Sequence, residues 1–394
     1  MRNSKETLIR PVGAPDSISR PIVTPLSTAV AFASRTPDEL DAQYEGREQG
    51  FTYAREGHPN ASVLAQRIDA LEGVTGGIVT SSGMSAVFAA LAGTLSAGDH
   101  VIGGDQLYGR SLRLMKEDLP RFGIETSLAD PTDANAFAKA IRPNTKAVLV
   151  EVVSNPTLRV ADMDGIAKLC ALKGITLMVD NTFTTPRAYK PFENGADVVI
   201  HSVTKLLAGH SDVTLGYVAA KDAVMQKKIY DFAVTTGMTA SPFDCWLAER
   251  GLATFDLRFE RAQANAVSLA DHLATLEGVK RVIYPLRADH PDHVRADAIL
   301  GGQGCNMVSF EVEGGRAAAN ALARGAEGIA FAPTLGDVGT TLSHAASSSH
   351  RALTPEAREA LGMTEGFFRV SVGLEESAAL NAVFTQAVQA ATEV

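Results

Sequence analysis

Residues 175–205 read ITLMVDNTFTTPRAYKPFENGADVVIHSVTK, and this stretch decides the fold class. It holds two short apolar runs, Ile175–Val179 and Val198–Ile200, whose β-branched residues predict strands. Because consecutive residues of a strand point to opposite faces, a run that is apolar throughout predicts a strand buried on both sides. Such strands are typical of a parallel sheet that helices cover on both faces.

The same alternation extends upstream. Further β-branched runs lie at 77–80, 100–102 and 147–150. Apolar residues at helical spacing precede or separate these runs, at Ala61–Leu71, 84–96, 109–119, 133–141 and 163–173. The pattern predicts an α/β domain with a mostly parallel sheet, in which ligands bind beyond the carboxyl ends of the strands.

The two ends of the chain differ from this central part. Five prolines between residues 11 and 37 argue against a long helix there, so we expect an irregular arm. A helix predicted over Cys245–Leu276 leads into a smaller α+β region, with strands at Met307–Val312 and Phe368–Val372 and a closing helix at Ser377–Thr392. We therefore divide the chain into an arm (1–55), a first domain (56–248) and a second domain (249–394).

The bulk composition excludes several classes of partner. The 394 residues are 45% hydrophobic and 21% charged, as in globular proteins, and the net charge of −9 disfavours nucleic acids and anionic membranes. No apolar stretch is long enough for a membrane helix or forms a secretory signal. Cys170, Cys245 and Cys305 are far apart and predict neither disulfides nor a metal site. We expect a cytoplasmic protein without a nucleic-acid or membrane partner.

Three groups at strand ends could carry chemistry. Ser81–Met84 follows a strand and opens a helix, where free N–H groups and the helix dipole would bind a phosphate; a plain serine cap is the alternative. Asp180 ends a buried strand, and a pyridinium nitrogen would be a suitable partner; a capping or salt-bridged aspartate is the alternative. Lys205 follows two hydroxyl residues, Ser202 and Thr204, an arrangement suited to a Schiff base beside a phosphate, although a single lysine after a strand is usually just solvated. Together, and in this order, the three groups favour pyridoxal phosphate (PLP).

Motifs along nearly the whole chain then resemble one enzyme family. They are Tyr53–Asn60, Ser82–Met84, Tyr108–Gly109, Ser154–Thr157, Val179–Phe183, His201–Lys205, Gly209–Asp212 and Arg369–Glu375. In content and order they resemble the Cys/Met-metabolism family of PLP-dependent enzymes. The resemblance implies PLP fold type I, with a mostly parallel large domain and a smaller α+β C-terminal domain. It implies that 56–248 binds PLP and that the 1–55 arm contacts a neighbouring subunit.

The resemblance also implies roles at the cofactor ring and at the substrate. Lys205 is the Schiff-base lysine and proton shuttle, Asp180 pairs with the pyridinium nitrogen, and Tyr108 stacks on the ring as a possible acid or base. Arg369 binds the substrate carboxylate as a bidentate fork. Asn155 lies near the phenolic oxygen of the cofactor and, with Thr334, beside the substrate.

The phosphate is expected to be held by two subunits. Ser82, Gly83, Met84, Ser202 and Thr204 are implied to hold it from one chain. Tyr53 and Arg55 are implied to reach the phosphate of the neighbouring subunit. A homotetramer built from dimers with shared active sites follows from the resemblance.

The segments that select the substrate depart from the family pattern. Thr334 stands where serine is usual, and Pro333 stands where γ-synthases and γ-lyases often have glutamate and other members an apolar or aromatic residue. Leu206, Ala208 and Arg110 replace a common tyrosine, a common asparagine and the cysteine typical of methionine γ-lyases. The cofactor site is intact, whereas the substrate pocket is unusual.

Four functions follow as alternatives. The first is a carbon–sulfur lyase that acts on cystathionine, methionine or a related amino acid by α,γ-elimination. The second is a γ-replacement enzyme, a cystathionine γ-synthase or an O-acyl-homoserine sulfhydrylase, and the third is a cystathionine β-lyase. The fourth, a PLP-binding protein without turnover, is disfavoured by the intact set of Lys205, Asp180, Tyr108 and Arg369.

Overall fold

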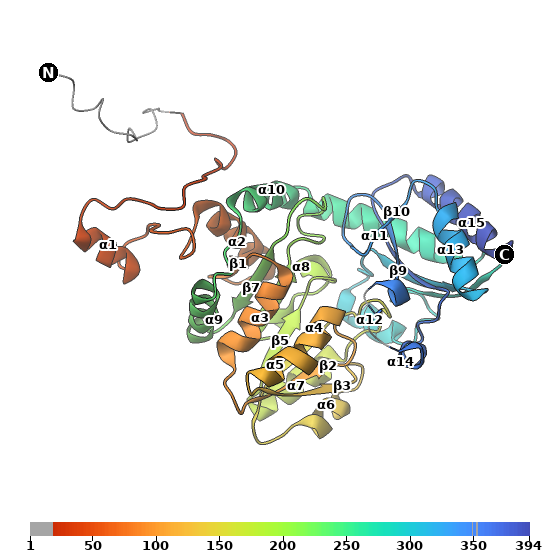
Figure 1. The fold of residues 1–394 in the computed structure, drawn as a ribbon, viewed down its shortest axis with the longest axis horizontal. Coiled ribbons are helices and arrows are strands. Elements are labelled where there is room, and N and C mark those ends of the chain that lie inside the picture. Colours follow the sequence, from red (N-terminus) through yellow and green to blue (C-terminus); the bar gives the residue numbers. More distant parts are fainter. Residues whose placement is uncertain (1–18, 349, 352–353) are drawn as a thin grey trace.

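A seven-stranded sheet forms the centre of the computed structural model, which describes residues 19–348, 350–351 and 354–394 (Figure 1). Its strand order is β1-β7-β6-β5-β4-β2-β3. Only β7 runs antiparallel to its neighbours within this sheet, so the sheet is mostly parallel, as expected. The strands are β1 (Ile78–Thr80), β2 (His100–Gly104), β3 (Glu125–Ala129), β4 (Thr145–Glu151), β5 (Thr176–Asp180), β6 (Val198–Ser202) and β7 (Gly216–Ala220).

Two of these strands were not expected from the sequence. β3 (Glu125–Ala129) is an edge strand of mixed polarity, and β7 (Gly216–Ala220) is built largely from glycine and alanine, which have weak strand propensity. Every residue of β7 is buried between β1 and β6. Pairing with strands distant in sequence therefore stabilises β7, whereas its local composition does not predict it.

Helices cover both faces of the large sheet, which is why its strands are apolar throughout. Val179 and Val199 pack into one core and their neighbours Met178 and Ile200 into the other. The first core lies under α2 (Pro59–Glu72), α6 (Ala134–Ala140), α7 (Met163–Lys173), α8 (Thr185–Ala188) and α10 (Pro242–Leu252). The second lies under α3 (Gly83–Thr94), α4 (Gly109–Arg113), η2 (Leu114–Asp118), α5 (Leu119–Arg121) and α9 (Ala223–Thr235).

The helix expected over Cys245–Leu276 is two helices, so that prediction was wrong. α10 ends at Leu252, and α11 (Phe255–Leu273) begins after the break. The guanidinium of Arg258 in α11 reaches back and donates to the carbonyl oxygen of Gly251 at 2.9 Å. It also donates to the carbonyl oxygens of Leu206 and Leu207, at 2.9 and 3.0 Å. The break thus lies where the chain passes the loop that follows Lys205.

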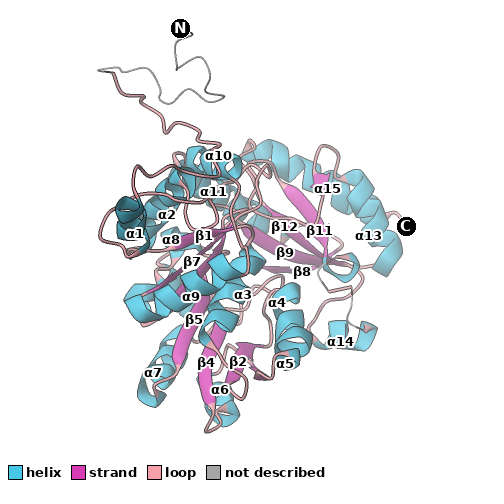
Figure 2. Cartoon of the chain, turned by 60° about the vertical axis from the view of Figure 1, so that its left-hand side comes forward, coloured by secondary structure: helices cyan, strands magenta, loops and turns pink. Residues whose placement is uncertain are grey.

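A second sheet of five strands follows α11 and has the order β10-β11-β12-β9-β8. Figure 2 labels four of these strands, β8, β9, β11 and β12. Two expected strands are present, β9 at the predicted bounds and β12 shifted by one residue, and the closing helix α15 (Ser377–Thr392) has its predicted bounds. This sheet shares a core with α11, α13 (Gly315–Gly325) and α15. The strands are β8 (Val279–Ile283), β9 (Met307–Val312), β10 (Ala330–Phe331), β11 (Thr341–His344) and β12 (Phe367–Ser371). The remaining helices are η3 (Pro191–Asn194), α12 (His293–Leu300), η4 (Ala345–Ser347) and α14 (Pro355–Ala360).

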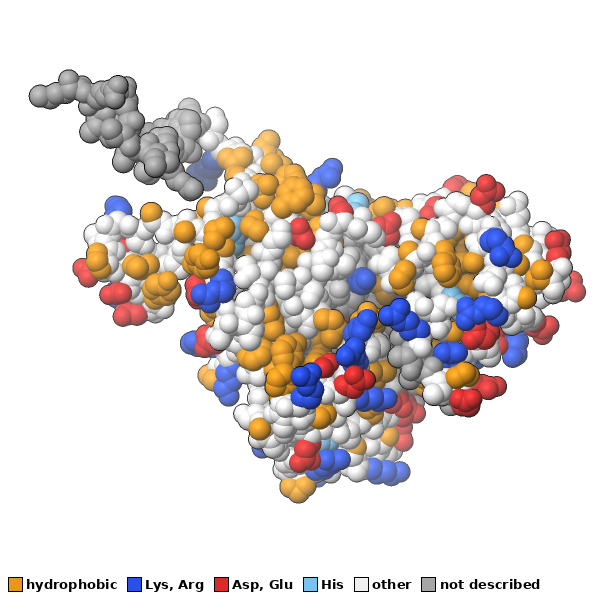
Figure 3. Space-filling model, in the orientation of Figure 1, with side chains coloured by type: hydrophobic (Ala, Val, Ile, Leu, Met, Phe, Trp, Pro, Cys, Tyr) orange, Lys and Arg blue, Asp and Glu red, His pale blue; other side chains and the backbone are white. Residues whose placement is uncertain are grey.

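The described part of the arm extends from the body of the molecule and contains one helix that was not expected. α1 (Pro37–Tyr44) begins after Thr36, whose side chain accepts a hydrogen bond from the Glu39 amide, and Pro37 occupies the first turn, where its missing N–H costs nothing. Hydrophobic side chains are visible on the surface of the arm (Figure 3). Ile22, Val23, Val30 and Tyr44 are exposed there. None of the described helices is long and apolar enough to cross a membrane.

Candidate active site

A cavity of about 240 Å³ lies at the carboxyl ends of β4, β5 and β6, and Arg369 of β12 also lines it. Twelve of the residues singled out from the sequence line it. They are Ser82, Gly83, Met84, Tyr108, Asn155, Asp180, Ser202, Thr204, Lys205, Pro333, Thr334 and Arg369. The rule that ligands bind beyond the strand ends of a parallel sheet therefore locates the cavity correctly.

The N-terminus of α3 forms one side of the cavity. The Ser82 side chain caps this helix by accepting a hydrogen bond from the Ser85 amide at 3.1 Å. A Cβ at Gly83 would lie 2.6 Å from the Cβ of Ser202, so glycine is needed for the helix to approach β6 this closely. The serine is thus a helix cap, and the helix also presents its positive end to the cavity beside the Ser202 hydroxyl, a suitable arrangement for a phosphate.

The Thr204 hydroxyl is engaged by the backbone. It accepts from the Leu215 amide at 2.9 Å and donates to the Leu215 carbonyl oxygen at 3.1 Å. These two bonds join the strand-end turn before Lys205 to the start of the β7 segment.

Asp180 and Lys205 both face the cavity from strand ends. Burial raises the pKa of Asp180, against the opposing effect of hydrogen bonds from Thr182, one of which comes from its amide at 3.0 Å. A protonated ring nitrogen would stabilise this carboxylate. Burial, and then the charge of Arg369, lower the pKa of Lys205, so its amine gives up a proton more readily than an exposed lysine. Its Nζ donates to the Thr334 hydroxyl at 3.4 Å.

Arg369 of β12 connects the segment after β4 with the segment after β10. Its Nη1 donates to Asn155 Oδ1 at 2.7 Å, and its Nη2 donates to the carbonyl oxygen of Thr334 at 2.6 Å. Burial lowers the pKa of the guanidinium to about 10, and its Nε is buried without a hydrogen-bond partner among the described residues. A buried cation held by neutral acceptors, with a spare donor, suits an incoming carboxylate.

Sequence reasoning assigned no individual role to several residues of the cavity, although Thr182 and Phe183 lie within the motif Val179–Phe183. The residues without an assigned role are Val87, Ser111, Glu151, Thr182, Phe183, Thr214 and Leu335. Glu151 is the most informative because its Oε1 accepts a hydrogen bond from the Tyr108 amide at 2.6 Å. It directly follows the apolar run 147–150, so the signal that singled out Asp180 was present for Glu151 too.

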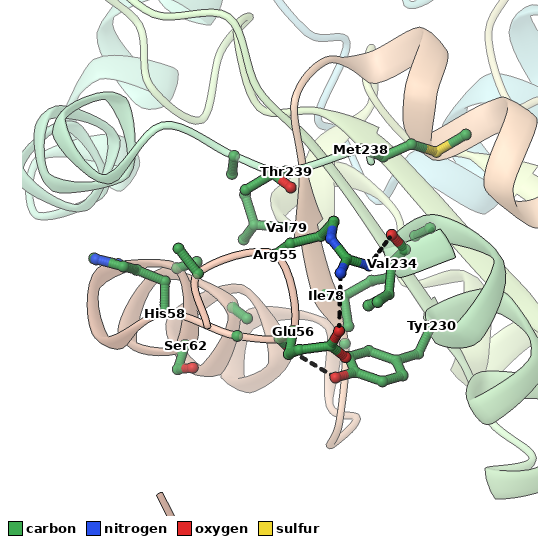
Figure 4. Close-up of a pocket in the computed structure, with 17 residues that line it drawn as sticks. Arg55, Glu56, His58, Ser62, Ile78, Val79, Tyr230, Val234, Met238 and Thr239 are labelled. Carbon is green, nitrogen blue, oxygen red and sulfur yellow. Dashed lines mark hydrogen bonds and ion pairs between the residues drawn. The ribbon is translucent and has the colours of Figure 1, made fainter. Parts of the chain in front are cut away.

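Tyr53 and Arg55 do not reach this cavity within one chain. Arg55 lines a separate hollow of about 150 Å³, where it donates to the Val234 carbonyl oxygen at 3.3 Å and pairs with Glu56 at 3.5 Å (Figure 4). The guanidinium lies 5.8 Å from the centre of the Tyr53 ring. The Tyr230 hydroxyl anchors the same turn by donating to the Glu56 carbonyl oxygen at 2.5 Å.

Comparison with known proteins agrees with this geometry. A family model described as Cys/Met metabolism PLP-dependent enzyme matches residues 7–389. The chain belongs to this family. It is 39% identical to a cystathionine β-lyase of Bacillus subtilis, over 93% of this chain and 92% of that enzyme. It is 35% identical to an L-methionine γ-lyase of Porphyromonas gingivalis, over 90% of this chain and 89% of that enzyme.

The similarity to a solved structure supports the same family assignment, through the fold and through the cofactor. The structure is a putative O-acetylhomoserine (thiol)-lyase of Campylobacter jejuni that carries a pyridoxyl-lysine. It has a TM-score of 0.91 and 28% identity, and the match covers 95% of this chain and 97% of that one. The family member described here is therefore a PLP-dependent enzyme of fold type I. The donors of its cavity fit the cofactor: a helix N-terminus for an anion, a buried carboxylate for a ring nitrogen and a desolvated lysine.

Proposed function

We propose that this enzyme is a carbon–sulfur lyase that acts by α,γ-elimination on sulfur-containing amino acids and works in the cytoplasm. The observation that supports it best is Arg369, a buried guanidinium with a spare Nε, in the same cavity as the desolvated amine of Lys205. The first suits the carboxylate of an amino acid, and the second suits proton transfer at its carbon atoms.

The residues around the cavity take separate roles in this proposal. PLP, when bound, supplies an electron sink for negative charge that develops on the substrate. Asp180 would keep the ring nitrogen protonated, and Tyr108 would stack against the ring and act as an acid or base. Lys205 takes a proton at Nζ from the substrate Cα and returns protons to the substrate carbons. Its lowered pKa favours the neutral amine that accepts the proton.

Two further groups hold the ligands. Ser82, Gly83, Met84, Ser202 and Thr204 hold the phosphate group. Arg369, with Asn155 and the Thr334 backbone as its hydrogen-bond partners, orients the amino-acid carboxylate. Asn155 belongs to the first domain, and Thr334 and Arg369 belong to the second. The hydrogen bond between Arg369 and Asn155 therefore also fixes the second domain against the strand ends of the first.

We further infer a homotetramer of dimers with shared active sites. The exposed apolar side chains of the arm, such as Ile22 and Val23, are suited to burial against another chain. Tyr53 and Arg55 lie on the same arm, outside their own cavity, so they are available to complete the phosphate site of a neighbour. Mixing Arg55→Ala and Lys205→Ala subunits tests the inference, because exchange would create one intact composite site per dimer.

Apolar side chains in the lining of the cavity favour an apolar leaving group. They include Val87, Phe183, Pro333 and Leu335. Pro333 has no side-chain carboxylate, so it offers the distal ammonium of cystathionine no charged partner. A missing charge-assisted hydrogen bond typically costs about 1.5–3 kcal/mol. Methionine and related thioethers should therefore be used at least as well as cystathionine.

Two other reactions are supported by the similar proteins. γ-Replacement of an activated homoserine by a thiol is favoured by the similarity to the O-acetylhomoserine (thiol)-lyase, and β-elimination by the similarity to the cystathionine β-lyase. The three reactions have different products and thiol requirements, so one set of assays separates them.

The test is to supply the PLP-loaded enzyme with methionine, homocysteine, cystathionine and O-acyl-homoserines, each with and without an added thiol. We expect 2-oxobutanoate from the thioether substrates without thiol, and none from the Lys205→Ala variant. Pyruvate as the sole keto acid would overturn the proposal in favour of β-elimination. Turnover only in the presence of a thiol would overturn it in favour of replacement. A preference for cystathionine more than tenfold above all other substrates would refute the role given to Pro333.

A further inference from the structure

A second carboxylate, Glu151, lies beside Asp180 in the cavity. We propose that Glu151 is a positioning residue that remains a neutral carboxylic acid, holds the Tyr108 backbone, and leaves the negative charge to Asp180. The inference rests on the proposed cofactor site, because it concerns how that site is kept at the right charge. It does not depend on which substrate the enzyme cleaves.

The sheet register brings the two carboxyl groups together. β4 and β5 are parallel neighbours, and Glu151 is the residue paired with Asp180 across them. Paired residues on adjacent strands point to the same face, with the strands about 4.8 Å apart. Both residues line the same cavity, and Glu151 is only 9% exposed. Two carboxylates this close, with little water around them, cannot both be ionised without a large cost in free energy.

The hydrogen bonds decide which residue keeps the charge. Thr182 stabilises the ionised form of Asp180 through its amide and its hydroxyl, and His201 adds a favourable electrostatic contribution. Glu151 accepts one hydrogen bond, from the Tyr108 amide, and this bond opposes the rise in its pKa only in part. Burial, followed by repulsion from Asp180, raises the pKa of Glu151 well above its ordinary value. Asp180 is therefore the better site for the charge, and Glu151 for the proton.

Other charged groups of the cavity fit the same assignment. Lys205 and Arg369 are the basic side chains among the described residues that line it, and the charge of Arg369 is expected to be neutralised by the substrate carboxylate. A single ionised Asp180 balances a protonated ring nitrogen. A second negative charge at Glu151 would add repulsion for both the phosphate and the substrate carboxylate.

A neutral acid can still position Tyr108. Its carbonyl oxygen accepts the Tyr108 amide, which lies at the start of α4, and this bond ties α4 to the end of β4. Tyr108 is 40% exposed and lines the cavity. The Glu151 bond restrains the backbone from which the Tyr108 ring extends.

The test compares the same change of charge at the two neighbouring positions, Glu151→Gln and Asp180→Asn. An infrared difference spectrum between wild-type protein and Glu151→Gln, both freed of PLP, should show the carbonyl stretch of a buried carboxylic acid in the wild type at neutral pH. In the PLP-loaded form, Asp180→Asn should shift the pH titration of the visible cofactor band and weaken PLP retention by more than about tenfold. Glu151→Gln should displace that titration by far less and lower kcat by no more than about threefold.

The Glu151→Ala variant separates the charge state of Glu151 from its role in holding the Tyr108 backbone. It removes the acceptor of the Tyr108 amide, and we expect kcat to fall by about tenfold or more, with partial rescue in Glu151→Gln. The proposal is overturned if the acid band is absent from the wild-type spectrum, or if Glu151→Gln matches Asp180→Asn in the cofactor titration. If Glu151→Ala does not fold, these two measurements still decide the matter. An enzyme that eliminates at Cβ, or that requires a thiol, would refute the proposed function and leave the infrared and spectral results unaffected.

Discussion

Arg369 allows a direct measurement of how the enzyme recognises an amino acid. Its two Nη atoms each donate to a neutral acceptor, and its Nε is buried without a partner among the described residues. We expect Arg369→Lys to lose the planar fork and with it a charge-assisted bond to the substrate carboxylate. Such a bond is worth about 1.5–3 kcal/mol, which corresponds to roughly tenfold to more than a hundredfold in affinity.

The assay is a thermodynamic cycle between this residue and the carboxylate. The dissociation constant is measured from the first change in the visible cofactor spectrum after rapid mixing, before methionine is consumed, for methionine and for 3-(methylthio)propylamine, which lacks the carboxylate. The wild type should prefer methionine, and Arg369→Lys should lose most of that preference, because only one ligand carries the group that Arg369 binds.

The control variant is Arg261→Lys, an exposed arginine of α11 that donates to the Glu375 carbonyl oxygen at 3.0 Å. It should retain the preference of the wild type. If Arg369→Lys weakened methionine and the amine by the same factor, Arg369 would act only through the fold and its assignment to the carboxylate would be wrong.

Three further results are expected. Borohydride reduction of the PLP-loaded enzyme should place the pyridoxyl adduct on Lys205 in a peptide mass map, and an adduct on another lysine would contradict the assignment. Arg258→Met should lower the free energy of unfolding of the PLP-free protein by about 2–4 kcal/mol, because three backbone carbonyl oxygens lose a buried donor, whereas Arg261→Met should change it by less than about 0.5 kcal/mol. Burial, then repulsion from Asp130, raises the pKa of Asp105 to about 6, so its raised value favours folding at low pH and this contribution is lost as the pH rises. The unfolding temperature of the wild type should therefore fall relative to Asp105→Asn between pH of about 4 and about 6, and parallel curves for the two proteins would show that Asp105 titrates normally.

Several features of the fold could be predicted because they depend on local pattern. The strand before Asp180 and the strand before Lys205 are apolar throughout, and the closing helix α15 has apolar residues at helical spacing. All three elements are present. β7 could not be predicted this way, because glycine and alanine carry little strand signal and its pairing partners β1 and β6 supply the hydrogen bonds. The division between α10 and α11 also had no local signal, since Arg258 stabilises the ends of both helices and the loop after Lys205 from a distance.

By itself, the sequence determined the parallel sheet, the family and most of the residues that line the cavity. Those conclusions rest on periodicity and on chemical groups placed directly after strands, and both are properties of short segments. Only the tertiary structure decided that Glu151 lies beside Asp180, that Arg369 meets Asn155 and Thr334, and that Arg55 lies apart from the cavity of its own chain. Strand register and domain contact bring together residues far apart in the chain, and the charge of a carboxyl group or a guanidinium depends on the burial and the neighbours that result.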